Sequence, residues 1–222
     1  MRIGITGQNG FIGYHLTQTI KYKHSCHTLV SFQKSFFEME SLLKEFVFSC
    51  DVIVHLAGVN RASSNEEVYN SNIQINVALK EALINSSFKG HLIFASSFQE
   101  DSDSLYGKAK KESRGFLEQT ISELGGKFTG VLIPNVFGPF GEPFYNSFIA
   151  TFCHQIVNGE KPTIHNDGIV NLIYINDLAE AFYQEIIDNK KQIKTVLVPH
   201  NATKKVSEIL HLLNLYKENY ID

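Results

Sequence analysis

Three residues near the middle of the chain could together perform acid–base chemistry on a carbonyl or hydroxyl group. Tyr106 and Lys110 are four residues apart in a stretch of helical character, so they share one face of a helix. A nearby ammonium favours the phenolate, which would lower the pKa of Tyr106 toward working pH. Ser97 follows an apolar run of strand length and would hydrogen-bond the same substrate oxygen. The pattern predicts a proton-transfer site; the alternative is a rim tyrosine beside a solvated lysine face.

A glycine-rich turn near the N-terminus could bind a phosphate group. Gly7, Gly10 and Gly13 lie between an apolar run at 2–6 and an amphipathic stretch at 11–22. Glycines at these positions allow a tight turn and close approach of the backbone to a pyrophosphate, while the helix N-terminus supplies amide donors. An ordinary glycine-rich turn is the alternative. The candidate cofactor-binding residues of the turn are Gly7, Asn9, Gly10, Phe11 and Ile12.

The end of the second expected strand indicates which dinucleotide the turn would hold. A free ribose 2′-hydroxyl is usually bound by an acidic residue at this point. The chain has Ser31-Phe32-Gln33-Lys34 instead, without a carboxylate. A lysine beside small polar residues suits a 2′-phosphate, so Gln33 and Lys34 are candidate cofactor-binding residues and NADP(H) is favoured over NAD(H). If Lys34 is only a solvated surface lysine, the choice stays open.

The elements that position these residues alternate between short apolar runs and longer helical stretches. The apolar runs are continuous, which is typical of parallel strands covered on both faces, and the alternation predicts an α/β fold with a doubly wound parallel sheet, a Rossmann fold. Strands are expected at 2–6, 27–32, 51–57, 91–96, 129–134 and 195–199. Helices are expected at 11–22, 38–48, 65–87, 104–124, 145–158, 177–188 and 204–215.

A cluster of prolines and glycines at 134–143 predicts where the domain organisation changes. We expect a dinucleotide-binding core at 1–140 and a small substrate-binding lobe at 141–222, packed closely on the core. The interval from residue 33 to 51 has room for one helix but hardly for a further strand, so the adenine pocket is expected to be trimmed.

Composition excludes several classes of protein. The chain has 222 residues, 43% of them hydrophobic, and a net charge of −3, which makes nucleic acid and anionic membranes unexpected partners. No apolar run reaches the roughly 18 to 20 residues that cross a bilayer, and the N-terminal residues lead straight into a strand, without room for a signal peptide. The three cysteines, Cys26, Cys50 and Cys153, are far apart and predict neither a disulfide framework nor a metal site. We therefore expect a cytoplasmic protein without membrane insertion.

Together these motifs resemble the extended short-chain dehydrogenase/reductases of the NAD-dependent epimerase/dehydratase family. Further matches are His55 to Gly58, Asn72, Pro134 to Gly138 and Ile175 to Asp177. The resemblance implies that Asn72 belongs to the catalytic group and supports Lys110 through a water, and that Lys110 also binds the nicotinamide ribose. It also implies a homodimer formed by the two long helices. The further cofactor-binding residues that it implies are Leu56, Ala57, Gly58, Pro134 and Asn135.

A narrower similarity is carried by His55 to Arg61, Ser96 to Gln99 and Tyr145 to Cys153. These segments resemble capsular-polysaccharide reductases that act on a UDP-2-acetamido-2,6-dideoxy-4-ketohexose with NADPH. The resemblance implies a UDP-sugar substrate and a role in capsule or O-antigen synthesis. The implied substrate-binding residues are Arg61, Ser97, Phe98, Asn135, Asn146 and Ser147, with Lys161 as a further candidate for the diphosphate.

The chain also departs from that subgroup. Leu132 and Gln33 stand where basic residues are expected. The subgroup carries a C-terminal cupin domain for epimerisation that has no counterpart before Asp222. The chain is therefore expected to be either a compact reductase with a separate epimerase partner or the first part of a longer protein.

Other functions on the same fold stay open. A nucleotide-sugar 4-epimerase keeps the same Ser, Tyr and Lys. A 4,6-dehydratase is less favoured, because such enzymes place Asp-Glu where this chain has Phe98 and Gln99. A non-catalytic NADP-binding regulatory protein is an alternative from another class, since fold does not determine function.

Overall fold

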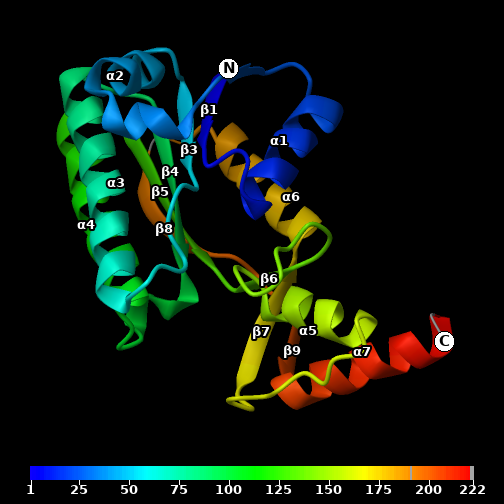
Figure 1. The fold of residues 1–222 in the computed structure, drawn as a ribbon. Helices are drawn as coiled ribbons and strands as arrows, with labels where there is room; N and C mark the ends of the chain where they lie inside the picture. The colour runs from blue at the N-terminus through cyan, green and yellow to red at the C-terminus, as the bar shows by residue number, and fades with distance from the viewer. Residues whose placement is uncertain (191, 221–222) are drawn as a thin grey trace. The chain divides into compact units, whose positions relative to one another are not determined.

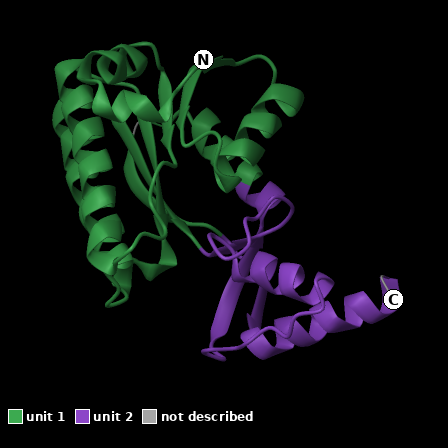
Figure 2. Cartoon of the chain, viewed as in Figure 1, with its two compact units in different colours: residues 1–133, 179–198 green, residues 134–178, 199–222 purple. Residues whose placement is uncertain are grey.

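The computed structural model describes residues 1–190 and 192–220, which fall into two compact units (Figure 2). The first unit comprises residues 1–133 and 179–198, and the second comprises residues 134–178 and 199–222. The sequence predicts the boundary between core and lobe after residue 140, whereas in the structure the second unit begins at Pro134. Residues 179–198 return to the first unit because they contain a strand that pairs with the sheet of that unit.

The first unit is built on a six-stranded, all-parallel sheet with the strand order β2-β1-β3-β4-β5-β8. Its strands are β1 (Arg2–Thr6), β2 (Thr28–Val30), β3 (Val52–His55), β4 (His91–Ser97), β5 (Lys127–Ile133) and β8 (Ile193–Leu197). Its α-helices are α1 (Phe11–Lys23), α2 (Glu40–Phe48), α3 (Asn65–Asn85), α4 (Leu105–Leu124) and α6 (Ile175–Ile187) from Ala179 onward, and its 3₁₀ helices are η1 (Lys34–Glu38) and η2 (Phe98–Asp101).

Helices cover both faces of this sheet. Figure 1 shows α2, α3 and α4 on one face and α1 and α6 on the other. The prediction of a doubly wound parallel sheet is confirmed. β2 forms one edge of the sheet, and the segment between β2 and β3 holds only η1 and α2. The expectation that this interval is too short for a further strand is confirmed as well.

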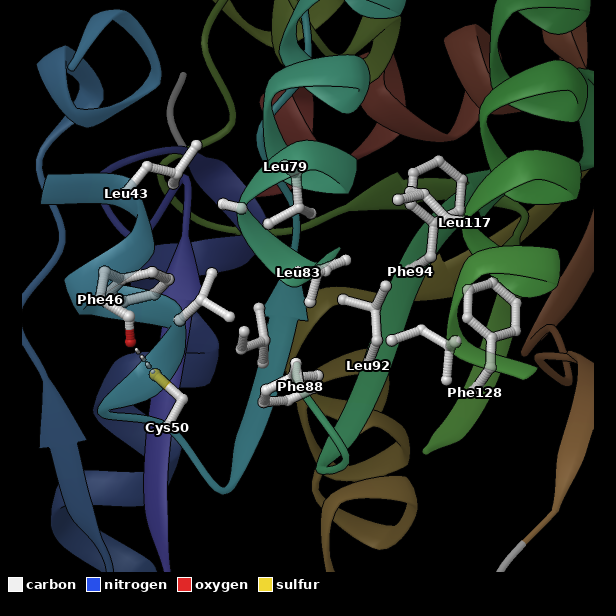
Figure 3. Packing of buried hydrophobic residues seen from close by; sticks show 14 of the residues in the cluster. Leu43, Phe46, Cys50, Leu79, Leu83, Phe88, Leu92, Phe94, Leu117 and Phe128 are labelled. Atoms are coloured by element: carbon white, nitrogen blue, oxygen red, sulfur yellow. Dashed lines mark hydrogen bonds between the residues drawn. The ribbon is translucent and has the colours of Figure 1, made fainter. Parts of the chain in front are cut away.

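Apolar side chains pack between the sheet and the helices α2, α3 and α4. Leu79 and Leu83 of α3 point toward Leu92 and Phe94 of β4 (Figure 3). Each such fully buried side chain contributes about 1.5–3 kcal/mol. This core holds β3 and β4 in place, and the carboxyl ends of those strands carry the candidate site.

Cys50 belongs to this core and is not a reactive thiol. Its Sγ donates to the Phe46 carbonyl at 3.1 Å (Figure 3). Burial raises the pKa of Cys50 to about 12, so the thiol stays protonated and packs as a small apolar group.

The second unit contains a three-stranded sheet with the order β6-β7-β9 and two helices. Its elements are β6 (Asn135–Phe137), β7 (Ile169–Tyr174), β9 (Ala202–Lys205), α5 (Phe148–Val157) and α7 (Val206–Tyr220). The sequence did not predict these three strands. β6 is short and partly buried, β9 is mostly exposed, and β7 has two buried residues among its six, so none of them shows the pattern of a buried parallel strand. Among the described residues, no helix is long and apolar enough to cross a membrane.

Candidate active site

Tyr106 lies in the first turn of α4, and a hydroxyl cap starts that helix. The side chain of Ser104 accepts from the amide of Gly107 at 3.0 Å, which satisfies one of the unpaired donors of the first turn. A Cβ at Gly107 would lie 2.0 Å from the carbonyl oxygen of Gln99. Only glycine therefore fits beside Tyr106, and it lets the start of α4 pack directly on η2.

Lys110 is one turn further along α4 and is 5% exposed. Its Nζ donates to the Ala95 carbonyl at 3.0 Å. The same atom lies 5.2 Å from the ring centroid of Phe94 and 5.9 Å from that of Tyr106. Burial lowers the pKa of Lys110 to about 8, and the negative charge of Glu100 acts in the opposite direction. Lys110 is thus a buried cation whose protonation state is sensitive to its surroundings.

The expectation that Lys110 lowers the pKa of Tyr106 is wrong for this structure. Burial raises the pKa of Tyr106 to about 12. The reason is that loss of water around the phenolate dominates, while the ammonium of Lys110 hydrogen-bonds the Ala95 carbonyl and lies 5.9 Å from the centroid of the phenol ring. Tyr106 therefore holds its proton at neutral pH, which suits a proton donor.

Ser97 ends β4 and pairs in register with Ile133, the last residue of β5. Its Oγ accepts from the amide of Gln99 at 3.1 Å and so caps η2. Phe98 is the first residue of η2, and both Ser97 and Phe98 are half-buried. The structure brings the end of β4, η2 and the first turn of α4 together, as the proton-transfer hypothesis requires.

Asn72 is fully buried on α3, and its side chain holds the loop that follows β3. Its Oδ1 accepts from the amide of Val59 at 3.2 Å, and its Nδ2 donates to the carbonyls of Val59 at 2.8 Å and Val68 at 2.7 Å. A Cβ at Gly58 would lie 2.9 Å from Asn72 Oδ1 and 3.3 Å from Lys110 Nζ. Asn72 thus brings the backbone at Gly58 against the ammonium of Lys110.

The glycine turn approaches the same loop from β1. Gly7 has a φ of +73°, and a Cβ there would lie 2.9 Å from the Ala57 amide nitrogen. A Cβ at Gly13 would lie 2.1 Å from the Gly7 carbonyl oxygen, so α1 packs closely on the turn. Gly10 precedes α1 and has no side chain to cap its first amides. Phe11 and Ile12 open the helix, and Asn9 is exposed.

These features fit a dinucleotide. The turn leaves helix amides without a side-chain cap, and glycine backbone lies where a diphosphate approaches such a fold. Gln8 Nε2 donates to the Phe32 carbonyl at 3.0 Å, which ties the turn to the end of β2. Gln33 and Lys34, the candidates for the adenosine ribose, follow directly and are exposed.

A buried histidine connects β1, which leads into the glycine turn, with the loop after β3, and the sequence alone suggested no role for it. The Oγ1 of Thr6 lies 2.7 Å from Nδ1 of His55 and accepts from the Ala57 amide at 3.2 Å. Burial lowers the pKa of His55 to about 3, helped by the charge of Lys110, so the ring is neutral. The sequence does hold a signal for this role, because a histidine ends the otherwise apolar run Val52–His55.

The remaining predicted residues lie in the second unit or on exposed loops. Asn135 begins β6, and Pro134 before it is buried. Asn146 Oδ1 accepts from the Glu142 amide at 2.9 Å, and Ser147 caps α5 by accepting from the Ala150 amide at 3.3 Å. Both side chains thus have structural contacts of their own. Arg61 and Lys161 are exposed. Substrate binding by these residues stays a prediction.

Within the described ranges, no group of three or more His, Cys, Asp or Glu side chains is placed to hold a metal ion.

A doubly wound parallel sheet with a glycine turn after its first strand is typical of dinucleotide-binding proteins. The chain belongs to the NAD dependent epimerase/dehydratase family, whose model matches residues 3–196.

Two curated relatives are similar in sequence. A UDP-2-acetamido-2,6-beta-L-arabino-hexul-4-ose reductase of Pseudomonas aeruginosa is 32% identical over 191 residues, which are 86% of this chain and 50% of the relative. CDP-abequose synthase of Yersinia pseudotuberculosis is 25% identical over 243 residues, covering 99% of this chain and 86% of the relative. The chain spans half the length of the first relative.

Solved structures agree with the fold. The capsular polysaccharide assembling protein CapF of Staphylococcus aureus matches with a TM-score of 0.79 at 27% identity, covering 100% of this chain and 59% of that one. A UDP-glucose 4-epimerase of Thermotoga maritima, solved with UDP-glucose, matches with a TM-score of 0.81 at 22% identity, covering 100% and 84%. The second likeness shows the fold alone.

Proposed function

We propose that the chain is an NADPH-dependent reductase of a 4-keto nucleotide sugar of the UDP-2-acetamido-2,6-dideoxyhexos-4-ulose type. The observation that carries the proposal is the grouping of Ser97, Tyr106 and buried Lys110 around η2 and the first turn of α4. The 32% identity to a reductase of that substrate class supports it.

In this mechanism each residue of the chain has one task. A bound nicotinamide would supply the hydride for C4 of the sugar. The phenol of Tyr106, protonated because burial raises its pKa, gives its proton to the oxygen that develops negative charge. Ser97 orients that oxygen by a hydrogen bond. Lys110 places a positive charge near the phenol and stabilises the phenolate that remains. Atoms and charge balance, because one hydride and one proton convert the ketone into an alcohol.

For the cofactor we propose NADPH. The first residues after β2 include the exposed cation Lys34 and no carboxylate. An ammonium at this point would attract a 2′-phosphate, whereas an acidic residue would bind a free 2′-hydroxyl.

The same proposal includes a homodimer, a substrate-binding second unit and a cytoplasmic setting. α3 and α4 pack side by side, and Val77 and Ile84 of α3 expose apolar side chains, which supports a homodimer through these helices.

The second unit would bind the sugar nucleotide, with Asn146 and Ser147 near its helix α5. Cys26, Cys50 and Cys153 are all unpaired thiols, which supports a reducing, cytoplasmic setting. Capsule or O-antigen synthesis is the pathway that such a product would serve.

The test is a stoichiometric incubation of the chain with NADPH and the 4-keto sugar nucleotide, followed by the near-ultraviolet absorbance of reduced nicotinamide. The proposal predicts loss of that absorbance and formation of a 4-hydroxy sugar. Tyr106→Phe should abolish the loss, and the exposed control Lys108→Gln should not. A chain that interconverts 4-hydroxy sugars without net oxidation of NADPH would be an epimerase, and one that binds NADPH but transforms no sugar would be a regulatory protein.

A further inference from the structure

A buried carboxylate lies three residues after Ser97. Glu100 of η2 is 6% exposed. Arg114 of α4 donates from Nε to Oε1 at 2.8 Å and from Nη2 to Oε2 at 2.9 Å. The hydroxyl of Ser96 donates to the same carboxylate. Such two-pronged, charge-assisted bonding is strong and geometrically specific.

The pair connects the segments that carry the candidate catalytic residues. Ser96 precedes Ser97 on β4, and Arg114 follows Lys110 by one helical turn on α4. The sheet in turn holds Arg114: its Nη1 donates to Thr195 Oγ1 of β8 at 3.2 Å. A Cβ at Gly130 of β5 would lie 2.6 Å from Arg114 Cδ, so the absence of a side chain there makes room for the arginine.

The turn between these segments has little freedom. Ser97 Oγ accepts from the Gln99 amide at 3.1 Å, and Ser102 Oγ donates to the Gln99 carbonyl at 2.7 Å. The same carbonyl lies against Gly107, the neighbour of Tyr106. A displacement of η2 would therefore move the Ser97 hydroxyl and the first turn of α4 relative to each other.

We propose that the Glu100–Arg114 ion pair is a positioning pair for the reaction: it sets the spacing of Ser97 and Tyr106 and supplies a negative counter-charge for Lys110. This inference rests on the function proposed above. A buried ion pair adds little net stability over apolar residues of similar volume, so stability alone does not account for it.

The second part of the proposal rests on placement: Glu100 accepts from Ser96, and the residue before Ser96 on β4 supplies the carbonyl that binds Lys110. The charges around Lys110 agree with it. Glu100 on η2 raises the pKa of Lys110 against the effect of burial. His55 on β3 is neutral, because its pKa is lowered to about 3. Tyr106 on the same helix holds its proton, because its pKa is raised to about 12. Glu100 is thus a negative charge that favours the protonated form of Lys110.

The chain offers a matched control. Asp101, the next residue of η2, forms an ion pair with Lys111 of α4 at 2.8 Å. This pair joins the same two elements but is exposed, with 87% of the Asp101 side chain accessible. Exposed pairs of this kind contribute little. If any ion pair between η2 and α4 supported activity, loss of either pair would lower kcat. If the Glu100–Arg114 pair positions the site, only its loss would lower kcat.

The experiment compares Glu100→Gln with Asp101→Asn in the full chain. For Glu100→Gln we expect kcat to fall about tenfold or more, with KM for NADPH and sugar nucleotide within about twofold of wild type, because misplacement affects the chemical step. We expect the alkaline limb of the kcat–pH profile to move to lower pH, since Lys110 loses its proton more easily. Asp101→Asn should stay within about twofold of wild type.

A second variant separates position from charge. Arg114→Lys keeps the positive charge but cannot form the bidentate bond. We expect it to lower kcat while leaving the pH profile in place. Should Glu100→Gln fail to fold at the assay temperature, wild-type kcat in Arg114→Lys would refute the positioning role.

NMR titration of the chain labelled with [¹³Cε]lysine, with the Lys110 signal assigned by Lys110→Met, requires no turnover. We expect Lys110 to titrate at lower pH in Glu100→Gln than in wild type. If wild type reduces no 4-keto sugar, the proposed function fails, and this titration still tests the counter-charge. A folded Glu100→Gln variant with wild-type kcat and an unchanged Lys110 titration would overturn the inference.

Discussion

Replacement of Lys110 by methionine should stabilise the fold while it removes activity. Methionine keeps the length of the stem but removes the charge. The pKa of Lys110 is lowered from 10.5 to about 8 by burial, which at about 1.4 kcal/mol per pKa unit is a penalty of about 3 kcal/mol for the charged form. Loss of the hydrogen bond to the Ala95 carbonyl costs about 1 kcal/mol. Below pH 8 the net gain in the free energy of unfolding is therefore about 2 kcal/mol.

The difference in stability between Lys110→Met and wild type should change with pH. In wild type, folded Lys110 loses its proton near pH 8 and unfolded Lys110 near 10.5. Between these values the unfolded chain binds more protons, so wild-type stability rises with pH. The advantage of Lys110→Met should shrink over this window and reverse to about −1 kcal/mol above it, where only the lost hydrogen bond remains.

Urea unfolding of both proteins between pH 7 and 11 measures this difference, in which all other titrating groups cancel. Lys108→Met on the exposed side of α4 is the control, and its stability should stay within about 0.5 kcal/mol of wild type. A Lys110→Met variant that is less stable than wild type at pH 7, or a difference that does not change with pH, would refute the assignment of Lys110 as a buried cation.

Three further outcomes are expected. Tyr106→Phe should lower kcat by about 10²- to 10⁴-fold with unchanged NADPH affinity, measured by turnover and fluorescence titration; a loss of affinity alone would contradict a proton-transfer role. Gly13→Ala should destabilise by about 1–3 kcal/mol and weaken NADPH binding, because its Cβ would lie 2.1 Å from the Gly7 carbonyl oxygen. Its control Gly115→Ala, on α4 with nothing within 4 Å of the added carbon, should instead stabilise by about 0.5–1 kcal/mol in thermal or urea unfolding. Asn72→Ala should lower the free energy of unfolding by about 2 kcal/mol by leaving the Val59 backbone unpaired, and an unchanged stability would contradict the role of Asn72 in holding the loop after β3.

The sequence predicted the cofactor-binding half of the fold well, because its strands are buried on both faces. The strand Val52–His55 is buried throughout, so its sequence is an apolar run that ends in a histidine. Ile169–Tyr174 of β7 is half-exposed and contains a polar residue, so its pattern is ambiguous and the strand was missed. The helix expected at 204–215 begins at Val206, because Ala202–Lys205 pairs antiparallel with β7, a contact that no local pattern reveals.

At the candidate site, residue identities were predictable but their electrostatics were not. Helical spacing placed Tyr106 near Lys110 correctly, because i and i+4 positions share a face. The direction of the Tyr106 pKa was wrong, since it depends on burial by parts of the chain distant in sequence. Glu100 and Arg114 are 14 residues apart, which is no regular spacing; they meet only because η2 folds back onto α4.

Transfer of deuterium from [4-²H]NADPH to the sugar tests the central claim most directly. We predict that one equivalent of NADPH is consumed per 4-keto sugar nucleotide, and that mass spectrometry and NMR find the label from the transferred position on C4 of the product. The folded Tyr106→Phe variant should bind the cofactor and give no labelled product. Folded wild-type chain that binds both ligands and leaves NADPH intact, or a product without deuterium at C4, would contradict the account.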